Sequence, residues 1–165
     1  MTDSVVPKRK NIRLKDYDYS SNGMYFLTIC TDKRKNLLSK IVGGDDLGAP
    51  KKIFLKPYGK IVEKYILSIE KAYDTVTVEN YIIMPNHIHL LILIDNYGLP
   101  RSSAPTISNI ISALKRFTNH DCHYKLWQRG YYDHIIRNQS DFEYHWNYIE
   151  YNALKEYSNI KGEAK

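Results

Sequence analysis

The stretch that most constrains the fold of this chain is Tyr81–Ile94, YIIMPNHIHLLILI. Two apolar runs in it, Tyr81–Met84 and Ile88–Ile94, flank the dipeptide Pro85-Asn86. Aliphatic and β-branched residues on both sides of a Pro-Asn turn signal predict the two strands of a β-hairpin. Proline cannot donate a hydrogen bond within a sheet, so Pro85 belongs in the turn. The chain is therefore expected to form a sheet with this hairpin at its centre.

Two histidines, His87 and His89, stand at the start of the second predicted strand. Because side chains alternate along a strand, both imidazoles are expected on one face, and Ile88 and Leu90 on the other. Two imidazoles on one strand face form a ready pair of metal ligands. They can equally be partly exposed residues at a strand end. The apolar run that follows them favours metal binding.

The composition is that of a globular protein without a membrane anchor. In the 165 residues, no apolar run reaches the ~18 residues of a membrane span, and the N-terminal segment lacks the apolar core of a secretory signal. Cys30 and Cys122 match no metal-site or disulfide-framework spacing. We therefore expect a reduced, cytoplasmic protein that does not bind membranes.

The charge balance favours an anionic partner. The net charge is +6, and 15 tyrosines are interspersed with lysines and arginines. Aromatic rings next to basic groups suit single-stranded nucleic acid, where bases stack and phosphates pair with cations. Basic proteins without such a partner are common, and tyrosines also fill half-buried positions. Charge alone therefore leaves both interpretations open.

Three regions are expected along the chain. Residues 1–22 are polar and basic and form either a solvated tail or an arm that contacts phosphate through groups such as Lys10 and Arg13. Residues 23–158 are expected to form one folded domain, and residues 159–165 a short tail.

Within that domain, residues 24–31 and 76–84 read as strands and residues 57–73 as a helix. Thr106 or Ser108 can cap a second helix that ends near residue 120, and on it Lys115 and Arg116 fall off the apolar stripe. Residues 32–56 are expected to form a loop with short extended pieces, residues 95–105 an exposed loop, and residues 126–138 a short strand or turn.

A last helix follows Ser140, which forms a capping-box pattern with Glu143. Tyr148 and Asn152 are spaced i and i+4 and so share one face of this helix. That face is predicted to lie off the core stripe, which consists of Phe142, Trp146, Ile149 and Ala153. A tyrosine in such a place can be catalytic or merely exposed. Other tyrosines compete with it for a catalytic role: Tyr131, Tyr132, Tyr144 and Tyr151.

Three motifs occur in a characteristic order: MPNHIHLLI, then WQRGYYDHIIRN, then YHWNYIEYNALK. In this combination the chain resembles the HUH single-tyrosine transposases, and within them most closely the REP-associated tyrosine transposases and their IS200-like relatives. The resemblance extends from about Met24 to Lys155. It implies an α+β fold, with a ferredoxin-like antiparallel sheet and helices packed on it.

The resemblance also implies roles for individual residues. His87 and His89 match the pair that binds a divalent metal, Mg²⁺ or Mn²⁺, and Tyr148 matches the nucleophile. Asn152, one turn later, matches the polar residue that can complete the metal site. Ala153 stands where relatives often have proline. The alanine should extend the helix, and we expect no cost to the chemistry.

The implied activity is cleavage and strand transfer of single-stranded DNA at hairpin-flanked sites through a 5′-phosphotyrosine intermediate. The implied setting is the bacterial cytoplasm and nucleoid, with the protein acting as a monomer or homodimer. Candidate DNA contacts, each of which can also be an ordinary surface charge, are Lys10, Arg13, Lys115, Arg116, Arg129 and Arg137.

Two alternatives remain at this stage. The chain can be a hairpin-DNA-binding protein of the same fold that has lost cleavage, or a metal-dependent phosphodiester hydrolase in which the histidines activate water. The presence of His87, His89, Tyr148 and Asn152 argues against loss of cleavage. Covalent trapping of DNA on the protein separates strand transfer from both alternatives.

Overall fold

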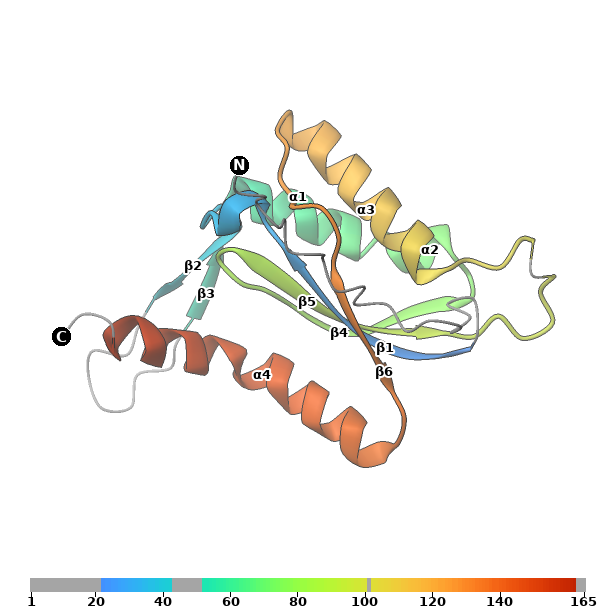
Figure 1. Cartoon of the computed structure of the whole chain (residues 1–165). Helices are drawn as coiled ribbons and strands as arrows, with labels where there is room; N and C mark the ends of the chain where they lie inside the picture. Colours follow the sequence, from blue (N-terminus) through green and yellow to red (C-terminus); the bar gives the residue numbers. More distant parts are fainter. Residues whose placement is uncertain (1–21, 43–51, 101, 163–165) are drawn as a thin grey trace, which may run out of the picture.

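The computed structural model describes residues 22–42, 52–100 and 102–162, with side chains as far as Tyr151. A four-stranded antiparallel sheet with the order β4-β5-β1-β6 forms its centre (Figure 1). The strands of this sheet are β1 (Gly23–Cys30), β4 (Val76–Ile83), β5 (His87–Ile94) and β6 (Tyr132–Ile136).

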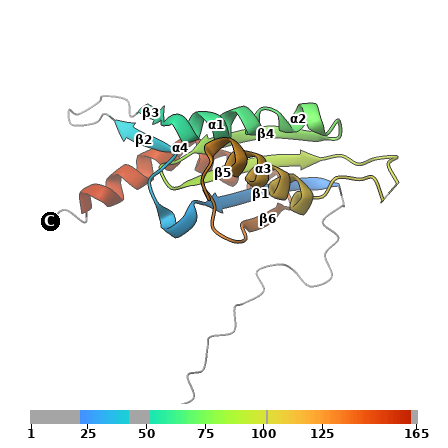
Figure 2. The same ribbon diagram turned by 90° about the horizontal axis from the view of Figure 1, so that it is seen from above.

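Helices cover both faces of the sheet. On one face lie α1 (Pro57–Ile66), α2 (Ile69–Ala72) and α3 (Ile107–Cys122), and on the other lies α4 (Gln139–Gly162), as Figures 1 and 2 show. The sequence of elements β1-α1-β4-β5-α3-β6 with this strand order is the split β-α-β arrangement of ferredoxin-like folds. The predicted fold class is confirmed.

A smaller unit follows β1. It comprises a short 3-10 turn, η1 (Asp32–Arg34), and a two-stranded antiparallel ribbon of β2 (Ser39–Val42) and β3 (Lys52–Leu55). The main-chain N–H of Thr31 donates to the carbonyl of Asn86 (2.9 Å), and the Thr31 hydroxyl donates to the same oxygen (3.0 Å). These bonds hold the start of η1 against the turn between β4 and β5.

Strand β5 is buried on both faces. Ile88, Leu90, Ile92 and Ile94 are fully buried in the main core with residues of α1 and α3, whereas Leu91 packs in a smaller cluster on the α4 face. The alternation predicted for this strand is therefore confirmed, and both histidines lie on the α4 face.

The two longer helices on the first face begin and end close to the predicted positions, with one interruption. α3 is capped by Thr106, whose hydroxyl accepts a hydrogen bond from the main-chain N–H of Asn109 (3.2 Å). The helix predicted over residues 57–73 is divided into α1 and α2. At the division, the Ser68 hydroxyl donates to the carbonyl of Tyr65 (2.8 Å), a local bond that competes with the helical pattern.

The capping box predicted for the last helix is wrong. Asn138 is the capping residue: its Oδ1 accepts a hydrogen bond from the main-chain N–H of Asp141 (2.9 Å). Ser140 lies in the first turn, and Glu143 accepts a hydrogen bond from Gln139 instead (2.9 Å). The sequence pattern matched two residues after the true cap, because an asparagine at this position caps as well as a serine.

Helix α4 crosses the sheet from one edge to the other. Near its start, Asp141 is bonded to His134 of β6, and nine residues later Glu150 accepts a hydrogen bond from Asn80 of β4 (3.0 Å). Between these contacts Ile149 packs on Phe26 and Leu91 of the two middle strands. Among the described residues, none of the helices has the length and apolar character of a membrane span.

We expect Asn138→Ala to lower the free energy of unfolding by about 1 kcal/mol, because α4 loses the side-chain acceptor for its first-turn N–H groups. Ser140→Ala, in the same exposed turn, should change it by less than about 0.5 kcal/mol. Urea denaturation monitored by circular dichroism measures both. Equal losses for the two variants would contradict the assignment of Asn138 as the cap.

Candidate active site on the α4 face of the sheet

A buried pair of imidazoles forms the centre of the site. His87 and His89 are 7% and 4% exposed, and their Nε2 atoms lie 3.1 Å apart. Their rings meet edge to face, with 4.7 Å between centroids. Since both rings project from one face of β5, as the strand period requires, the two Nε2 atoms converge on one point.

The outer nitrogen of each ring has a partner that fixes its orientation. Nδ1 of His87 lies 2.6 Å from Oδ1 of Asn86 in the turn, and Nδ1 of His89 lies 2.8 Å from the hydroxyl of Thr28, its cross-strand neighbour on β1. The amide oxygen of Asn86 can only accept, so Nδ1 of His87 carries the hydrogen and its Nε2 keeps a lone pair. The Thr28 hydroxyl can donate or accept, which allows His89 either tautomer.

Both imidazoles are neutral at pH 7. Burial, with a smaller contribution from the positive charge of Arg34, lowers the pKa of His87 to about 4. Burial, followed by the neighbouring His87, lowers the pKa of His89 to about 3. The neutral ring is the form that binds metal ions, so this environment keeps both residues ready as ligands.

Tyr148 of α4 lies directly against this pair. Its ring centroid is 5.2 Å from that of His89 and 5.8 Å from that of Phe26, in both cases edge to face. The expectation that Tyr148 lies off the core stripe is wrong, because α4 lies across the sheet and presents a wide face to it. That face includes Tyr148 as well as the fully packed Ile149.

The four competing tyrosines lie elsewhere. Tyr131 packs against the main core on the opposite face, and Tyr132 is exposed on β6, two strands away from β5. Tyr144 stacks on the outer side of Tyr148 with 6.4 Å between centroids and is 62% exposed. Tyr151 is also exposed. Of these five tyrosines, Tyr148 is the one whose ring contacts a histidine of the pair.

Three predicted site residues lie outside the part of the chain that is described in full. Asn152 belongs to α4, one turn beyond Tyr148, but its side chain is outside the described residues. Lys10 and Arg13 fall in residues 1–21, which are also outside them. Their assignments as metal ligand and DNA contacts stay predictions.

Lys115 does not face solvent as expected. Its ammonium group donates to the main-chain carbonyls of Gln128 (3.0 Å) and Gly130, and burial lowers its pKa to about 8. It therefore ties the segment before β6 to α3, on the face opposite the histidine pair (Figure 1).

The other described basic candidates are exposed. The Arg116 guanidinium lies over the ring of Phe117, 4.7 Å from its centroid. Arg129 lies in the loop before β6, and Arg137 lies in the turn between β6 and α4. Nothing in the structure brings these three arginines together, and their roles as DNA contacts stay predictions.

Sequence reasoning missed a cation beside the site. Arg34 of η1 is close enough for its charge to lower the pKa of both His87 and His89. The hydrogen bonds from Thr31 to the Asn86 carbonyl bring η1 to this position. The charged run DKRKN contained the signal, but only the pairing of β1 with β5 shows which turn it faces.

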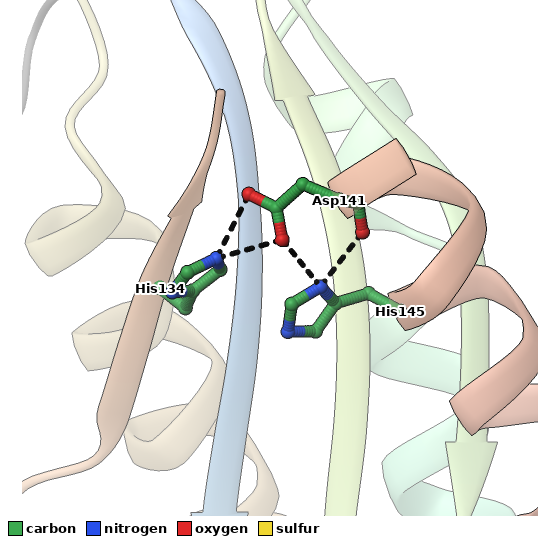
Figure 3. A group of neighbouring side chains, drawn as sticks. All are labelled: His134, Asp141 and His145. Carbon is green, nitrogen blue, oxygen red and sulfur yellow. Dashed lines mark hydrogen bonds and ion pairs between the residues drawn. The ribbon is translucent and has the colours of Figure 1, made fainter. Parts of the chain in front are cut away.

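Sequence reasoning also missed a second polar cluster on the same face, formed by His134 of β6 and by Asp141 and His145 of α4 (Figure 3). Partial burial tends to raise the pKa of the Asp141 carboxyl. Hydrogen bonds from His134 and from the main chain of Arg137 outweigh this effect and hold the pKa below its ordinary value. The i, i+4 spacing of Asp141 and His145 was visible in the sequence, but their proximity to His134 depends on how α4 packs.

The ring of Phe26 lies between the two polar groups. It stacks on His89 with 5.1 Å between centroids and contacts His145 at 4.5 Å. The site is therefore continuous from β6 to β5: the cluster, Phe26, the histidine pair and Tyr148.

A ferredoxin-like antiparallel sheet that carries a His-x-His pair, with a tyrosine helix across that face, matches the HUH fold that the sequence motifs predict. No protein-family profile matches the chain. A putative REP-associated tyrosine transposase of Haemophilus influenzae is 28% identical over 84% of this chain and 74% of that protein. A REP-associated tyrosine transposase of Escherichia coli K12 is 30% identical over 47% of this chain and 44% of that protein.

Among solved structures, a REP-associated tyrosine transposase bound to a REP hairpin shares the fold, with a TM-score of 0.62 and 20% identity over 87% of this chain and 74% of that chain. The chain is thus similar to the REP-associated tyrosine transposases and their IS200-like relatives, the family that its sequence motifs resemble.

In buffer with a chelator, we expect the free energy of unfolding to fall as the pH is lowered from about 6.5 towards 4. The unfolded histidines take up protons near pH 6.5, whereas the folded chain holds His87 and His89 neutral down to about 4 and 3, so unfolding binds protons in this window. Each residue contributes up to about 1.4 kcal/mol per pH unit.

Urea denaturation at pH 7, 6 and 5 measures this slope. His89→Gln should reduce it, because one of the two depressed groups is removed, while His123→Gln, at an exposed position, should leave it unchanged. A wild-type slope no steeper than that of His89→Gln would contradict the buried, neutral state of the pair.

Proposed function

We propose that this protein is a metal-dependent single-strand DNA endonuclease and strand transferase that acts through a covalent bond between DNA and Tyr148. One observation carries the proposal: the Tyr148 ring lies 5.2 Å from that of His89, whose Nε2 is 3.1 Å from the Nε2 of His87. A nucleophile beside a pair of metal ligands is an arrangement suited to metal-assisted phosphoryl transfer through a covalent intermediate.

The residues at the site fit a divalent cation. A separation of 3.1 Å is close to that of neighbouring ligands around an octahedral ion with bonds of about 2.1 Å. Both rings are neutral, and Asn86 and Thr28 hold them from the outer side, as hydrogen-bond partners of metal-binding histidines commonly do. Asn152 is the proposed third ligand. The proposed ion, Mg²⁺ or Mn²⁺, supplies Lewis-acid neutralisation of the scissile phosphate when bound.

The protein's own contribution is the nucleophile and its alignment. The phenolic oxygen of Tyr148 attacks the scissile phosphorus and loses its proton to solvent. A bond from phosphorus to the tyrosine oxygen forms and the bond to the 3′ oxygen breaks. The products are a 5′-phosphotyrosine and a strand end that takes up a proton as a free 3′-hydroxyl. The energy of the broken ester is conserved in the new one, so a 3′-hydroxyl can reverse the step without ATP.

The proposed substrate is single-stranded DNA next to a hairpin, in line with the hairpin named for the structurally similar transposase. Within this site Arg34 is the proposed contact to the scissile phosphate, because its charge reaches both histidines. Contacts to flanking phosphates are proposed for the other exposed arginines, Arg116, Arg129 and Arg137, and for Lys10 and Arg13. Lys115 has a structural role that competes with a phosphate contact.

The decisive test is covalent trapping. Single-stranded DNA with the hairpin that flanks the gene is incubated with Mn²⁺ and with wild type, Tyr148→Phe or Tyr144→Phe. We expect a denaturation-resistant protein–DNA adduct in wild type and Tyr144→Phe, and none in Tyr148→Phe, because only the last loses the attacking oxygen. Tyr144→Phe is the matched control, since it removes the hydroxyl of the tyrosine that stacks on Tyr148.

An adduct that survives in Tyr148→Phe would move the nucleophile to another tyrosine. Metal-dependent cleavage without any adduct would favour a hydrolase, and tight binding without cleavage would favour a binding protein.

Arg34→Gln should lower the single-turnover cleavage rate about tenfold, because the charge next to the attacked phosphate is lost, although solvent screens part of its effect. Lys33→Gln is the matched control in the same exposed turn and should change the rate by less than about twofold. Raising the salt concentration should narrow the difference between Arg34→Gln and wild type. Equal cleavage rates for wild type, Arg34→Gln and Lys33→Gln would show that Arg34 does not contact the scissile phosphate.

A further inference from the structure

We propose that His134, Asp141 and His145 form a second metal site, for a divalent transition ion such as Zn²⁺, separate from the His87–His89 pair. The site connects β6 to the first two turns of α4 (Figure 3). It does not depend on the DNA chemistry proposed for Tyr148.

The donor atoms already converge. Nε2 of His134 is 3.0 Å from each carboxylate oxygen of Asp141, and Nδ1 of His145 is 3.1 Å from Oδ1 of the same group. One ligand atom from each residue can be chosen so that all three lie within 4.8 Å of one another. Ligands around a tetrahedral Zn²⁺ with bonds of about 2.0–2.1 Å are separated by about 3.3 Å. The three groups therefore need only small movements to surround one ion.

The chemistry of the donor set selects the class of ion. Two imidazoles and one carboxylate, with a fourth position left for water, suit Zn²⁺ and similar ions better than Mg²⁺ or Ca²⁺, which prefer oxygen ligands. The side chains of Asp141 and His145 are only 19% and 12% exposed, whereas that of His134 is 34% exposed. The cluster is thus partly withdrawn from water and open on the side of β6, where an ion can enter.

The hydrogen positions change when an ion binds. In the absence of an ion, Nδ1 of His145 faces the main-chain oxygen of Asp141 (2.9 Å), and a carbonyl only accepts, so this nitrogen carries a hydrogen. Nε2 of His134 likewise donates to the carboxylate. As a ligand, each ring keeps one hydrogen on the nitrogen that faces away from the ion. The competing state is therefore a hydrogen-bonded clamp built from the same three residues.

The location gives the ion a positioning effect. His145 is three residues before Tyr148 on the sheet-facing side of α4, and Phe26 lies between His145 and His89. An ion bound at the cluster fixes α4 to β6 and so limits the rotation and sliding of the helix that carries Tyr148.

The test uses the full chain with His87→Gln and His89→Gln, so that ions bound by the pair do not contribute. Zn²⁺ binding is measured by competition with a chromophoric chelator, and Co²⁺ binding by its visible absorption. We expect about one ion per chain, and at least tenfold weaker binding after a further Asp141→Asn or His134→Gln substitution. His123→Gln, an exposed histidine at the end of α3, is the matched control and should not change the affinity.

Zn²⁺ should also raise the Tm of the His87→Gln/His89→Gln protein but not of its Asp141→Asn derivative, because only the folded cluster binds. Circular dichroism without metal establishes that each variant is folded. The single variants Asp141→Asn and His134→Gln, which keep the His87–His89 pair, provide a second comparison. Each of them should bind one ion fewer than wild type. The proposal would be overturned if the folded His87→Gln/His89→Gln protein bound neither Zn²⁺ nor Co²⁺. It would also be overturned if neither Asp141→Asn nor His134→Gln changed the affinity. The three residues would then form only the hydrogen-bonded clamp.

Discussion

The structure depends on the burial of β5 on both faces. Four aliphatic side chains of this strand, at alternate positions, fill the core beneath α1 and α3. Because successive side chains of a strand point to opposite faces, the intervening side chains face α4. Two of these intervening side chains are His87 and His89. A shift of the strand by one residue would turn the aliphatic side chains towards α4 and bury both imidazoles in the main core, where a neutral but unpaired ring nitrogen is costly. The hydrophobic effect that fixes the register of β5 therefore also determines that both histidines point towards α4.

Burial then prepares the pair chemically. Removal from water disfavours the imidazolium form, so both rings are neutral at pH 7, while Asn86 and Thr28 satisfy the outer nitrogens. The cost of burying two polar rings is offset by these bonds and by the stacking of Phe26 on His89. The same low dielectric strengthens the interactions of any charge held at the pair, whereas Arg34 lies in an exposed turn and is partly screened by solvent. Stability and electrostatics thus favour the same arrangement.

Local patterns predicted the parts of this site that local physics determines. The hairpin, the shared face of the histidines and the Thr106 cap follow from strand alternation and capping, which act over a few residues. The predicted stripe of Phe142, Trp146 and Ile149 does pack on the sheet, but the packed face of α4 is wider than this stripe and also includes His145 and Tyr148. Arg34 and His134 could not be assigned at all, since their proximity to β5 and α4 arises from the pairing of β1 with both neighbours. Lys115 read as a surface charge because a sequence does not show that the carbonyls of Gln128 and Gly130 face it.

The position of Tyr148 relative to the histidines follows from how α4 is held. The helix crosses the whole sheet and has polar contacts at both edges, Asp141 with His134 on β6 and Glu150 with Asn80 on β4. Between them Ile149 is buried on Phe26 and Leu91, which sets the height of the helix above the sheet.

Apolar packing has little directional preference, so by itself it would tolerate rotation of α4 about its axis. The directional contacts at the two edges remove that freedom, because hydrogen bonds weaken steeply when their angles change. Tyr148 lies between the two anchors, over the middle strands, so a displacement at either edge changes its approach to His89. The strands that hold α4 at its ends are thus different from the strand that carries the histidines, and the site depends on all of them.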